Sequence, residues 1–149
     1  MNKTLVIVPT YNEKENLPPL AERLLSLPLP VDLLVVDDKS PDGTGKIADG
    51  LAAKHPSIHV LHRAVKNGLG RAYCDGFKWA LQRDYEFIME MDGDFSHNPD
   101  DIPRFVDAAM KQQADLVLGS RYCNGIRVIN WPLGRLLLSM SAAKYVQTI

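Results

Sequence analysis

The run Leu33-Leu34-Val35-Val36-Asp37-Asp38 sets four apolar residues directly before two carboxylates. Continuous rather than alternating hydrophobicity is typical of a strand covered on both faces, as in a parallel sheet. Short apolar runs of the same kind recur along the chain at Leu5–Val8, Ile58–Leu61, Phe87–Met89 and Leu116–Leu118. We therefore expect a sheet of five buried strands, in which the second strand ends in acidic residues.

Segments with helical spacing of apolar residues lie between these runs, at residues 17–25, 45–54, 69–81 and 102–109. Asn98 and Pro99, before the last segment, are typical of an N-cap followed by proline at the first helical position. The alternation of strands and helices indicates right-handed βαβ crossovers. We expect an α/β fold with a doubly wound, mostly parallel sheet, in a single domain over residues 1–149.

Composition and charge argue against several classes of protein. Of 149 residues, 17 are Lys or Arg and 18 are Asp or Glu, so the net charge of −1 argues against a nucleic-acid partner. No segment approaches the ~20 apolar residues of a transmembrane helix. Cys74 and Cys123 lack the spacing of metal ligands, and we interpret them as reduced thiols of a cytoplasmic protein.

Polar residues gather where three of the expected strands end. These clusters are Pro9–Glu13, Asp37–Gly43 and Asp92–Asp94. Ligands of open α/β sheets bind outside the carboxyl ends of the strands. Several carboxylates at one edge repel each other unless a cation or a proton joins them. The pattern therefore indicates a site for a cation, a nucleoside hydroxyl, or both, although the second cluster is also ordinary turn chemistry.

The turn Asp92-Gly93-Asp94 is the most specific of these clusters. Its two carboxylates can both face one hard cation, and Mg²⁺ or Mn²⁺ prefers such oxygen ligands while keeping positions open for substrate phosphates. Gly93 allows a ligand to approach the backbone closely. His97 follows the turn and is a candidate for the outer shell of the metal.

Other phosphate and nucleotide sites do not match the sequence. A receiver-type phosphoacceptor pocket would need an acidic pair after the first strand, where Pro9 stands instead. A Rossmann site would need a Gly-rich turn at the same place. The run Asn67-Gly68-Leu69-Gly70 is Gly-rich but has no P-loop lysine. It is either a tight turn into the next helix or a segment whose backbone lines the side of a nucleotide pocket.

Taken together, the motifs at the strand ends resemble those of the family-2 inverting glycosyltransferases, in particular the polyprenol-phosphate (dolichol-phosphate) mannosyltransferase group. The motifs that carry the resemblance are Val8–Glu13, Val35–Thr44, Met91–Pro99, Gly119–Tyr122 and Asn130–Pro132. The resemblance covers essentially the whole chain. It implies a glycosyltransferase A-type nucleotide-sugar-binding fold.

The resemblance also implies roles for individual residues. Five of them would enclose the nucleobase and ribose of the donor: Pro9, Tyr11, Glu13, Val36 and Asp38.

A second group would meet the sugar diphosphate. Asp92, Gly93 and Asp94 would hold the metal and the diphosphate, with Asp94 as the principal metal ligand. Arg121 would lie near the transferred sugar and its phosphates. At Ser96 relatives often have a glutamine that also reaches the metal, and the shorter serine would need an intervening water.

The implied reaction transfers mannose from GDP-mannose to a membrane polyprenyl phosphate with inversion, using Mg²⁺ or Mn²⁺. A phosphate monoester is already anionic at neutral pH, so it can attack without a general base. The enzyme would act peripherally at the cytoplasmic face of a membrane. The alternatives are a UDP-sugar as donor, or a nucleotide-binding module without turnover.

The last part of the chain shows apolar residues at helical spacing from Leu133 to Val146, after Trp131. This helix either lies on a membrane surface or packs on the sheet. The pattern runs to Ile149 without a cap or a further strand. We therefore expect a C-terminal truncation that leaves the donor part, lacks the acceptor part and turns over poorly. The oligomeric state is left open.

Overall fold

The computed structural model describes residues 3–120 and 132–146. The chain divides into two compact units, Met1–Asp115 and Leu116–Ile149, each of which is described by itself below. The first unit contains the sheet and every strand end that the sequence marks as polar.

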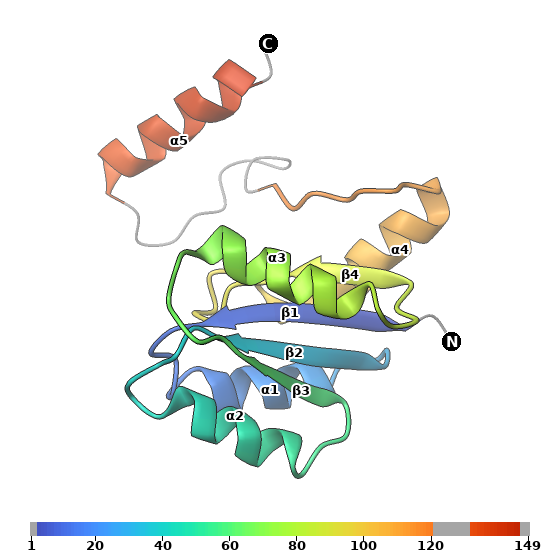
Figure 1. The fold of residues 1–149 in the computed structure, drawn as a ribbon. Helices are drawn as coiled ribbons and strands as arrows, with labels where there is room; N and C mark the ends of the chain where they lie inside the picture. The colour runs from blue at the N-terminus through green and yellow to red at the C-terminus, as the bar shows by residue number, and fades with distance from the viewer. Residues whose placement is uncertain (1–2, 121–131, 147–149) are drawn as a thin grey trace. The chain divides into compact units, whose positions relative to one another are not determined.

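Four parallel strands form the sheet of the first unit: β1 (Thr4–Thr10), β2 (Val31–Asp37), β3 (Ile58–His62) and β4 (Phe87–Glu90). Their order is β3-β2-β1-β4, so the chain moves outward from β1 to β3 and then returns to the other side of β1 (Figure 1). Every residue of β1 is buried. The expected parallel sheet is confirmed for four of the apolar runs.

Helices cover both faces of this sheet. One face carries α1 (Leu17–Leu25) and α2 (Thr44–Ala52), and the opposite face carries α3 (Leu69–Ala80) (Figure 1). A 3₁₀ turn, η1 (Pro99–Asp101), leads into α4 (Ile102–Gln112). The expected cap is confirmed, because the Asn98 side chain accepts a hydrogen bond from the Asp100 amide at 3.1 Å.

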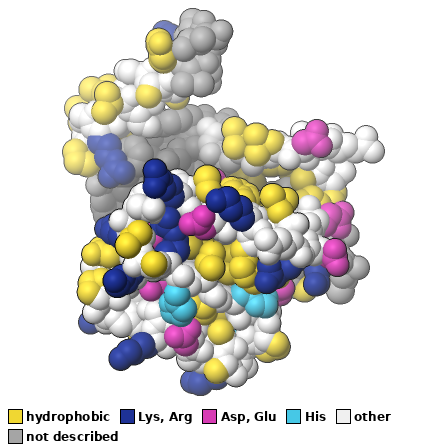
Figure 2. Space-filling model, viewed as in Figure 1, with side chains coloured by type: hydrophobic (Ala, Val, Ile, Leu, Met, Phe, Trp, Pro, Cys, Tyr) yellow, Lys and Arg dark blue, Asp and Glu magenta, His cyan; other side chains and the backbone are white. Residues whose placement is uncertain are grey.

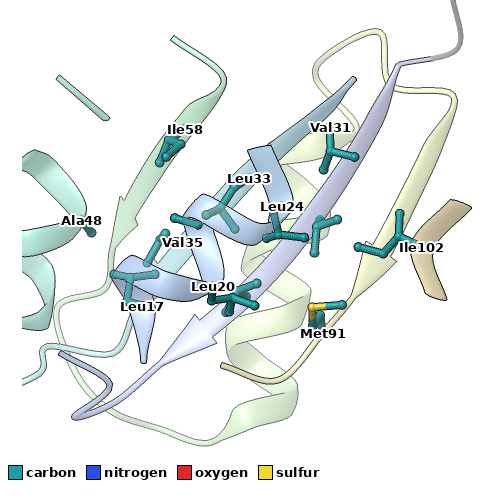
Figure 3. Close-up of a cluster of buried hydrophobic side chains, with 13 residues drawn as sticks. Leu17, Leu20, Leu24, Val31, Leu33, Val35, Ala48, Ile58, Met91 and Ile102 are labelled. Carbon is teal, nitrogen blue, oxygen red and sulfur yellow. The ribbon is translucent and has the colours of Figure 1, made fainter. Parts of the chain in front are cut away.

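The alternation of side chains along the central strands creates two cores. Val6 and Val8 of β1 belong to the core cluster on the α1 side. The same cluster contains Leu20 and Leu24 of α1 and Ile102 at the start of α4 (Figure 3). The alternate residues face α3, and they are Leu5, Ile7, Leu34 and Val36. Both clusters are almost fully closed to solvent, so the sheet is a rigid platform for its polar edge.

Two expectations about the elements are wrong. Leu116–Leu118 forms no strand, and Leu116 and Leu118 are 73% and 77% exposed. Three residues need a paired neighbour to form a strand, and the described part of the chain supplies none. The segment 69–81 also does not present all of its apolar residues to the sheet: Leu69 and Leu81 are 55% and 76% exposed, whereas α3 is buried through Ala72, Gly76 and Ala80, with larger side chains such as Phe77 partly buried beside them.

The second unit contains one described helix, α5 (Leu133–Val146), where the sequence predicts it. Leu133, Leu137 and Leu138 are 70%, 55% and 73% exposed. Within the described ranges, no helix combines the length and the apolarity needed to span a bilayer. Whether α5 lies on a membrane surface stays a prediction.

Candidate functional site

The carboxyl ends of β1 and β4 lie at the point where the strand order reverses. β2 and β3 lie on one side of β1, whereas β4 pairs with its other side (Figure 1). The loop after β1 leads into α1 and the loop after β4 leads into η1 and α4, and both α1 and the start of α4 pack on the same face of the sheet. Such a switch point is where open α/β sheets bind their ligands.

Pro9 opens this point further. Met91 donates its amide to the Ile7 carbonyl at 3.1 Å, and Asp38 donates to the Thr10 carbonyl at 3.0 Å. Odd-numbered residues of β1 thus direct their backbone groups to β4. Pro9 has no N–H to offer on that side, and the β1–β4 register ends at Ile7 and Glu90. The two strands separate where the acidic turn begins.

The acidic turn lies directly against the loop after β1. A Cβ placed on Gly93 would be 3.4 Å from Val8 Cγ1, 3.5 Å from Glu13 Cγ and 3.7 Å from the Pro9 carbonyl oxygen. These are ordinary van der Waals distances, so the backbone at Gly93 lies close against the strand and the loop that follows it. The structure therefore brings together Pro9, Glu13 and Gly93, three residues that the sequence assigned to one site.

Asp92 is held by two side chains from other segments. Its Oδ1 accepts a hydrogen bond from the Tyr73 hydroxyl at 3.1 Å, and its amide donates to His97 Nδ1 at 3.2 Å. The other His97 nitrogen lies 3.9 Å from Asp92 Oδ2. His97 is thus next to the acidic turn, as expected. Tyr73 on α3 is a contact that sequence reasoning missed.

Asp94 is exposed at the tip of the turn. Its Oδ1 accepts a hydrogen bond from the Ser96 amide at 2.9 Å. This bond is the main cause that holds the pKa of Asp94 below its usual value, so the group stays a carboxylate at neutral pH. Ser96 therefore supports Asp94 through its backbone.

The donor set suits a divalent ion that keeps water ligands. No cluster of three or more His, Cys, Asp or Glu side chains in residues 3–120 and 132–146 can enclose a metal. Two carboxylates flanking Gly93 nevertheless match the pattern of Mg²⁺ or Mn²⁺, which binds one or two carboxylates and takes its other ligands from phosphates and water. Asp92 and Asp94 are the residues that would hold such an ion.

The expected nucleoside residues lie in different surroundings. Tyr11 is 38% exposed, and the Lys66 ammonium lies 3.2 Å from the centroid of its ring. Glu13 accepts a hydrogen bond from the Asn16 side chain at 2.7 Å. The Val36 side chain is fully buried and packs toward Gly76 of α3, so it belongs to the core on that face of the sheet.

The acidic pair after β2 is not a solvated turn. Asp37 and Asp38 are 4% and 5% exposed. Asp37 accepts hydrogen bonds from Thr10 at 3.4 Å and from the Ser40 hydroxyl at 2.6 Å. Asp38 instead forms an ion pair with Arg63, which follows β3. The two neighbouring carboxylates are therefore held by different partners: Asp37 by hydroxyl groups of its own loop and of β1, and Asp38 by an arginine.

Three loops at this edge contain a non-glycine residue in the left-handed region. These are Asn12 (φ 62°) after β1, Lys39 (φ 58°) after β2 and Phe95 (φ 61°) after β4. The conformation costs about 1 kcal/mol or more for a residue such as lysine or phenylalanine. Such residues concentrate at functional sites, in agreement with the position of the acidic turn. Arg121, by contrast, lies outside the described residues.

Tyr73 gives a pH dependence that can be measured. Burial, and then the charge of Asp92, raise the pKa of its hydroxyl above the ordinary value of about 10. The Tyr73 hydroxyl thus stays protonated to a higher pH in the folded state than in the unfolded state. Its contribution to the free energy of unfolding is complete below pH ~10 and is lost as the pH rises beyond that value. We expect the free energy of unfolding, from urea titrations, to fall less steeply above pH ~10 in Tyr73→Phe than in the wild type. Equal slopes would contradict the assignment.

Comparison with known proteins shows the family of the chain. The family model described as "Glycosyl transferase family 2" matches residues 5–147. The chain belongs to glycosyl transferase family 2. Among curated members, it is 52% identical over 144 residues to the polyprenol monophosphomannose synthase of Mycolicibacterium smegmatis, covering 96% of the chain and 54% of the relative. It is 50% identical over 143 residues to the undecaprenyl-phosphate mannosyltransferase of Micrococcus luteus, covering 96% and 58%.

Solved structures place the sheet among glycosyltransferase A-type folds. The mannosyltransferase PcManGT of Pyrobaculum calidifontis, solved with GDP-Man and Mn²⁺, superposes with a TM-score of 0.60 at 25% identity, covering 78% of this chain and 33% of that one. S. aureus TarS, solved with UDP-GlcNAc, gives 0.66 at 26% identity, covering 87% and 37%. The chain thus spans little more than half of the two curated family-2 relatives, and about a third of each solved structure.

Proposed function

We propose that this chain binds GDP-mannose and a divalent metal at the β1–β4 switch point, as the donor-binding part of a polyprenyl-phosphate mannosyltransferase. The observation that carries the proposal is the contact of the acidic turn with the loop after β1, centred on Gly93. It places a carboxylate pair suited to a metal diphosphate beside the residues expected around the nucleoside. The chain is 50% and 52% identical to two mannosyltransferases that are named for a polyprenyl-phosphate acceptor. This similarity supports mannose as the transferred sugar and a lipid phosphate as the acceptor.

The residues of the chain would act by position and charge. Asp92 and Asp94 would hold the metal, which when bound neutralises charge on the leaving diphosphate. Asp92 is oriented for this by Tyr73 and His97. Arg121 would contact the phosphates through its guanidinium, a group suited to bidentate binding. The polyprenyl phosphate would attack opposite the diphosphate, and the sugar would be inverted.

No residue is needed as a general base in this reaction. The acceptor is an anion already, so its oxygen carries no proton that must be removed before attack. What the site must supply is alignment of donor and acceptor. The acceptor would come from a membrane, and we place the reaction at its cytoplasmic face, with the protein peripheral to the bilayer.

A UDP-sugar is the second candidate donor. The observation that favours it is the TM-score of 0.66 with TarS solved with UDP-GlcNAc, against 0.60 with the GDP-mannose enzyme. We give more weight to the identity of 50% to 52% with the mannosyltransferases, since TarS is 26% identical.

Competition between the two nucleotides tests this choice. With Mn²⁺ present, we expect GDP to displace a fluorescent GDP analogue from the chain at lower concentration than UDP does. Stronger displacement by UDP would assign the site to a UDP-sugar. Failure of both nucleotides to bind would leave only the fold in common with the relatives.

A further inference from the structure

Three consecutive backbone amides of the loop after β1 donate to side chains of the loop after β2. The Asn12 amide donates to Ser40 Oγ at 3.1 Å, and the Glu13 amide donates to Thr44 Oγ1 at 3.0 Å. The amide of the next residue donates to Asp42 Oδ2 at 3.3 Å. The partners lie 28 to 31 positions apart in the sequence, so these contacts join two separate loops at one edge of the sheet.

Each of the two hydroxyl groups is oriented by an aspartate of its own loop. Ser40 Oγ donates to Asp37 Oδ1 at 2.6 Å, and Thr44 Oγ1 donates to Asp42 Oδ1 at 2.6 Å. A hydroxyl has one proton, so after that proton is donated to a carboxylate the oxygen can only accept further hydrogen bonds. Both oxygens are therefore set as acceptors for the amides of the loop after β1.

Thr44 is the most enclosed residue of this set. It is the first residue of α2 and is 0% exposed. Its own amide also donates to Asp42 Oδ1, at 3.0 Å. Solvent does not reach the Thr44 hydroxyl, so water cannot replace a partner that is lost there, and a buried group without a partner is unfavourable. The contact between Thr44 and Glu13 therefore depends on this hydroxyl.

Glu13 is held at each of its polar groups. Its amide donates to Thr44, and its carbonyl accepts the Asn16 and Leu17 amides at 3.1 and 2.9 Å. Its carboxylate accepts the Asn16 side chain at 2.7 Å. A Cβ placed on Gly93 would lie 3.5 Å from Glu13 Cγ, which is van der Waals contact. Thr44 is thus linked to the backbone of the acidic turn through a single residue, Glu13.

The loop after β1 has a conformation that needs such support. Asn12, directly before Glu13, lies in the left-handed region with φ 62°. Asparagine adopts this conformation as an isolated residue and at some cost in energy. The hydrogen bonds to Ser40 and Thr44 start at this residue and at the next, so they hold the loop where its own backbone preference is weak.

We propose that Thr44 is a positioning residue for the acidic turn, which it holds in place through the backbone of Glu13. This inference rests on the proposed function, because its effect is expressed at the metal and the diphosphate. A site whose groups are already in place binds without the cost of ordering them, and a loosely supported site binds more weakly. Loosening Glu13 removes the support on one side of the turn that contains Asp92 and Asp94.

Pyrophosphate with Mn²⁺ is a suitable probe, because it engages the acidic turn without a nucleoside. Calorimetry measures its affinity for the whole chain. Thr44→Val keeps the shape of the side chain and removes the hydroxyl. We expect this variant to bind pyrophosphate roughly tenfold more weakly, as is found when a group that supports a metal ligand is removed. Thr44→Ser keeps the hydroxyl and should bind as the wild type does.

Two controls separate positioning from stability. Thr4→Val makes the same substitution at another buried threonine, at the opposite end of β1, whose Oγ1 has no hydrogen-bond partner among the described residues. Its pyrophosphate affinity should be unchanged. Val31→Ala removes part of a buried side chain at the start of β2 and should lower the stability of the fold. Urea titrations give the stability of each variant, and only Thr44→Val should combine lower stability with weaker pyrophosphate binding.

Three results would overturn the positioning role while the proposed function stands. They are wild-type pyrophosphate affinity in Thr44→Val, a loss in Thr44→Ser as large as in Thr44→Val, and an equal loss in Val31→Ala. A wild-type chain that binds no pyrophosphate in the presence of Mn²⁺ would instead overturn the metal-diphosphate site of the proposed function, and this inference with it.

A second variant keeps the test decisive should Thr44→Val fail to fold. Ser40→Ala breaks the neighbouring contact between the same two loops, at a half-buried position outside the helices and strands. It should also weaken the binding of pyrophosphate with Mn²⁺. Wild-type affinity in Ser40→Ala would show that the contacts between these loops do not position the acidic turn.

Discussion

Replacing Asp94 by alanine should abolish the Mn²⁺-dependent binding of GDP-mannose by this chain. We expect affinity to fall by roughly 100-fold or more, since a bound divalent ion contributes several kcal/mol of charge stabilisation. The residue is exposed, and within the described part of the chain its side-chain hydrogen bond comes from Ser96 of its own turn. Its removal should therefore leave the core intact. Calorimetry with and without Mn²⁺ measures the effect directly.

A matched control guards against a general charge effect. Asp107 is another exposed aspartate, which pairs with Lys111 on α4 at 2.8 Å, away from the acidic turn. Asp107→Ala should bind GDP-mannose and Mn²⁺ as the wild type does. If Asp94→Ala kept metal-dependent binding, or if both variants lost it equally, the acidic turn would not be the metal site.

The substitution Gly76→Ala should destabilise the fold strongly. A Cβ on this helical residue would lie 2.6 Å from Ile7 Cγ2, in the middle of the fully buried strand β1. Either α3 or the sheet must move, and overpacking of this kind costs about 1–3 kcal/mol. Urea unfolding followed by circular dichroism measures the change.

The opposite result is expected at Gly50. It is exposed on α2, and a Cβ there would meet nothing within 4 Å. Alanine should therefore stabilise the chain by about 0.5–1 kcal/mol, through its better helix propensity. A Gly76→Ala variant as stable as Gly50→Ala would show that α3 packs less closely on the sheet than the structure indicates.

Sequence periodicity was sufficient for the sheet and its covering helices because those patterns are local. The runs at Leu5–Val8 and Leu33–Val36 are long and uniformly apolar, and both became buried strands. Leu116–Leu118 has the same composition but forms no strand, because strand formation also depends on a partner that no local pattern reveals. Likewise, the fully buried residues of α3 are the small ones, Ala72, Gly76 and Ala80, which an apolar pattern built on large residues does not single out.

The acidic turn was visible in the sequence because its two carboxylates are close along the chain. The groups that orient the edge were not, since Tyr73 and Arg63 reach Asp92 and Asp38 across 19 and 25 positions. One signal was present: β3 pairs with β2, His62 ends β3 opposite Asp37, and Arg63 and Asp38 are the next residues of the two chains, which places a basic residue beside an acidic one. The role of Arg121 stays a prediction.

The proline in β1 has a consequence for how this site can persist through sequence change. Hydrogen bonding between neighbouring parallel strands extends wherever both supply their groups, and a gap between two strands tends to close by one more rung. At Pro9 the hydrogen bond that residue 9 would donate to the neighbouring strand is chemically impossible, whatever residues follow Glu90, because proline has no N–H. Substitutions in the loop after β4 can therefore not restore this hydrogen bond. The separation of the two strands at the acidic turn depends on Pro9 of β1.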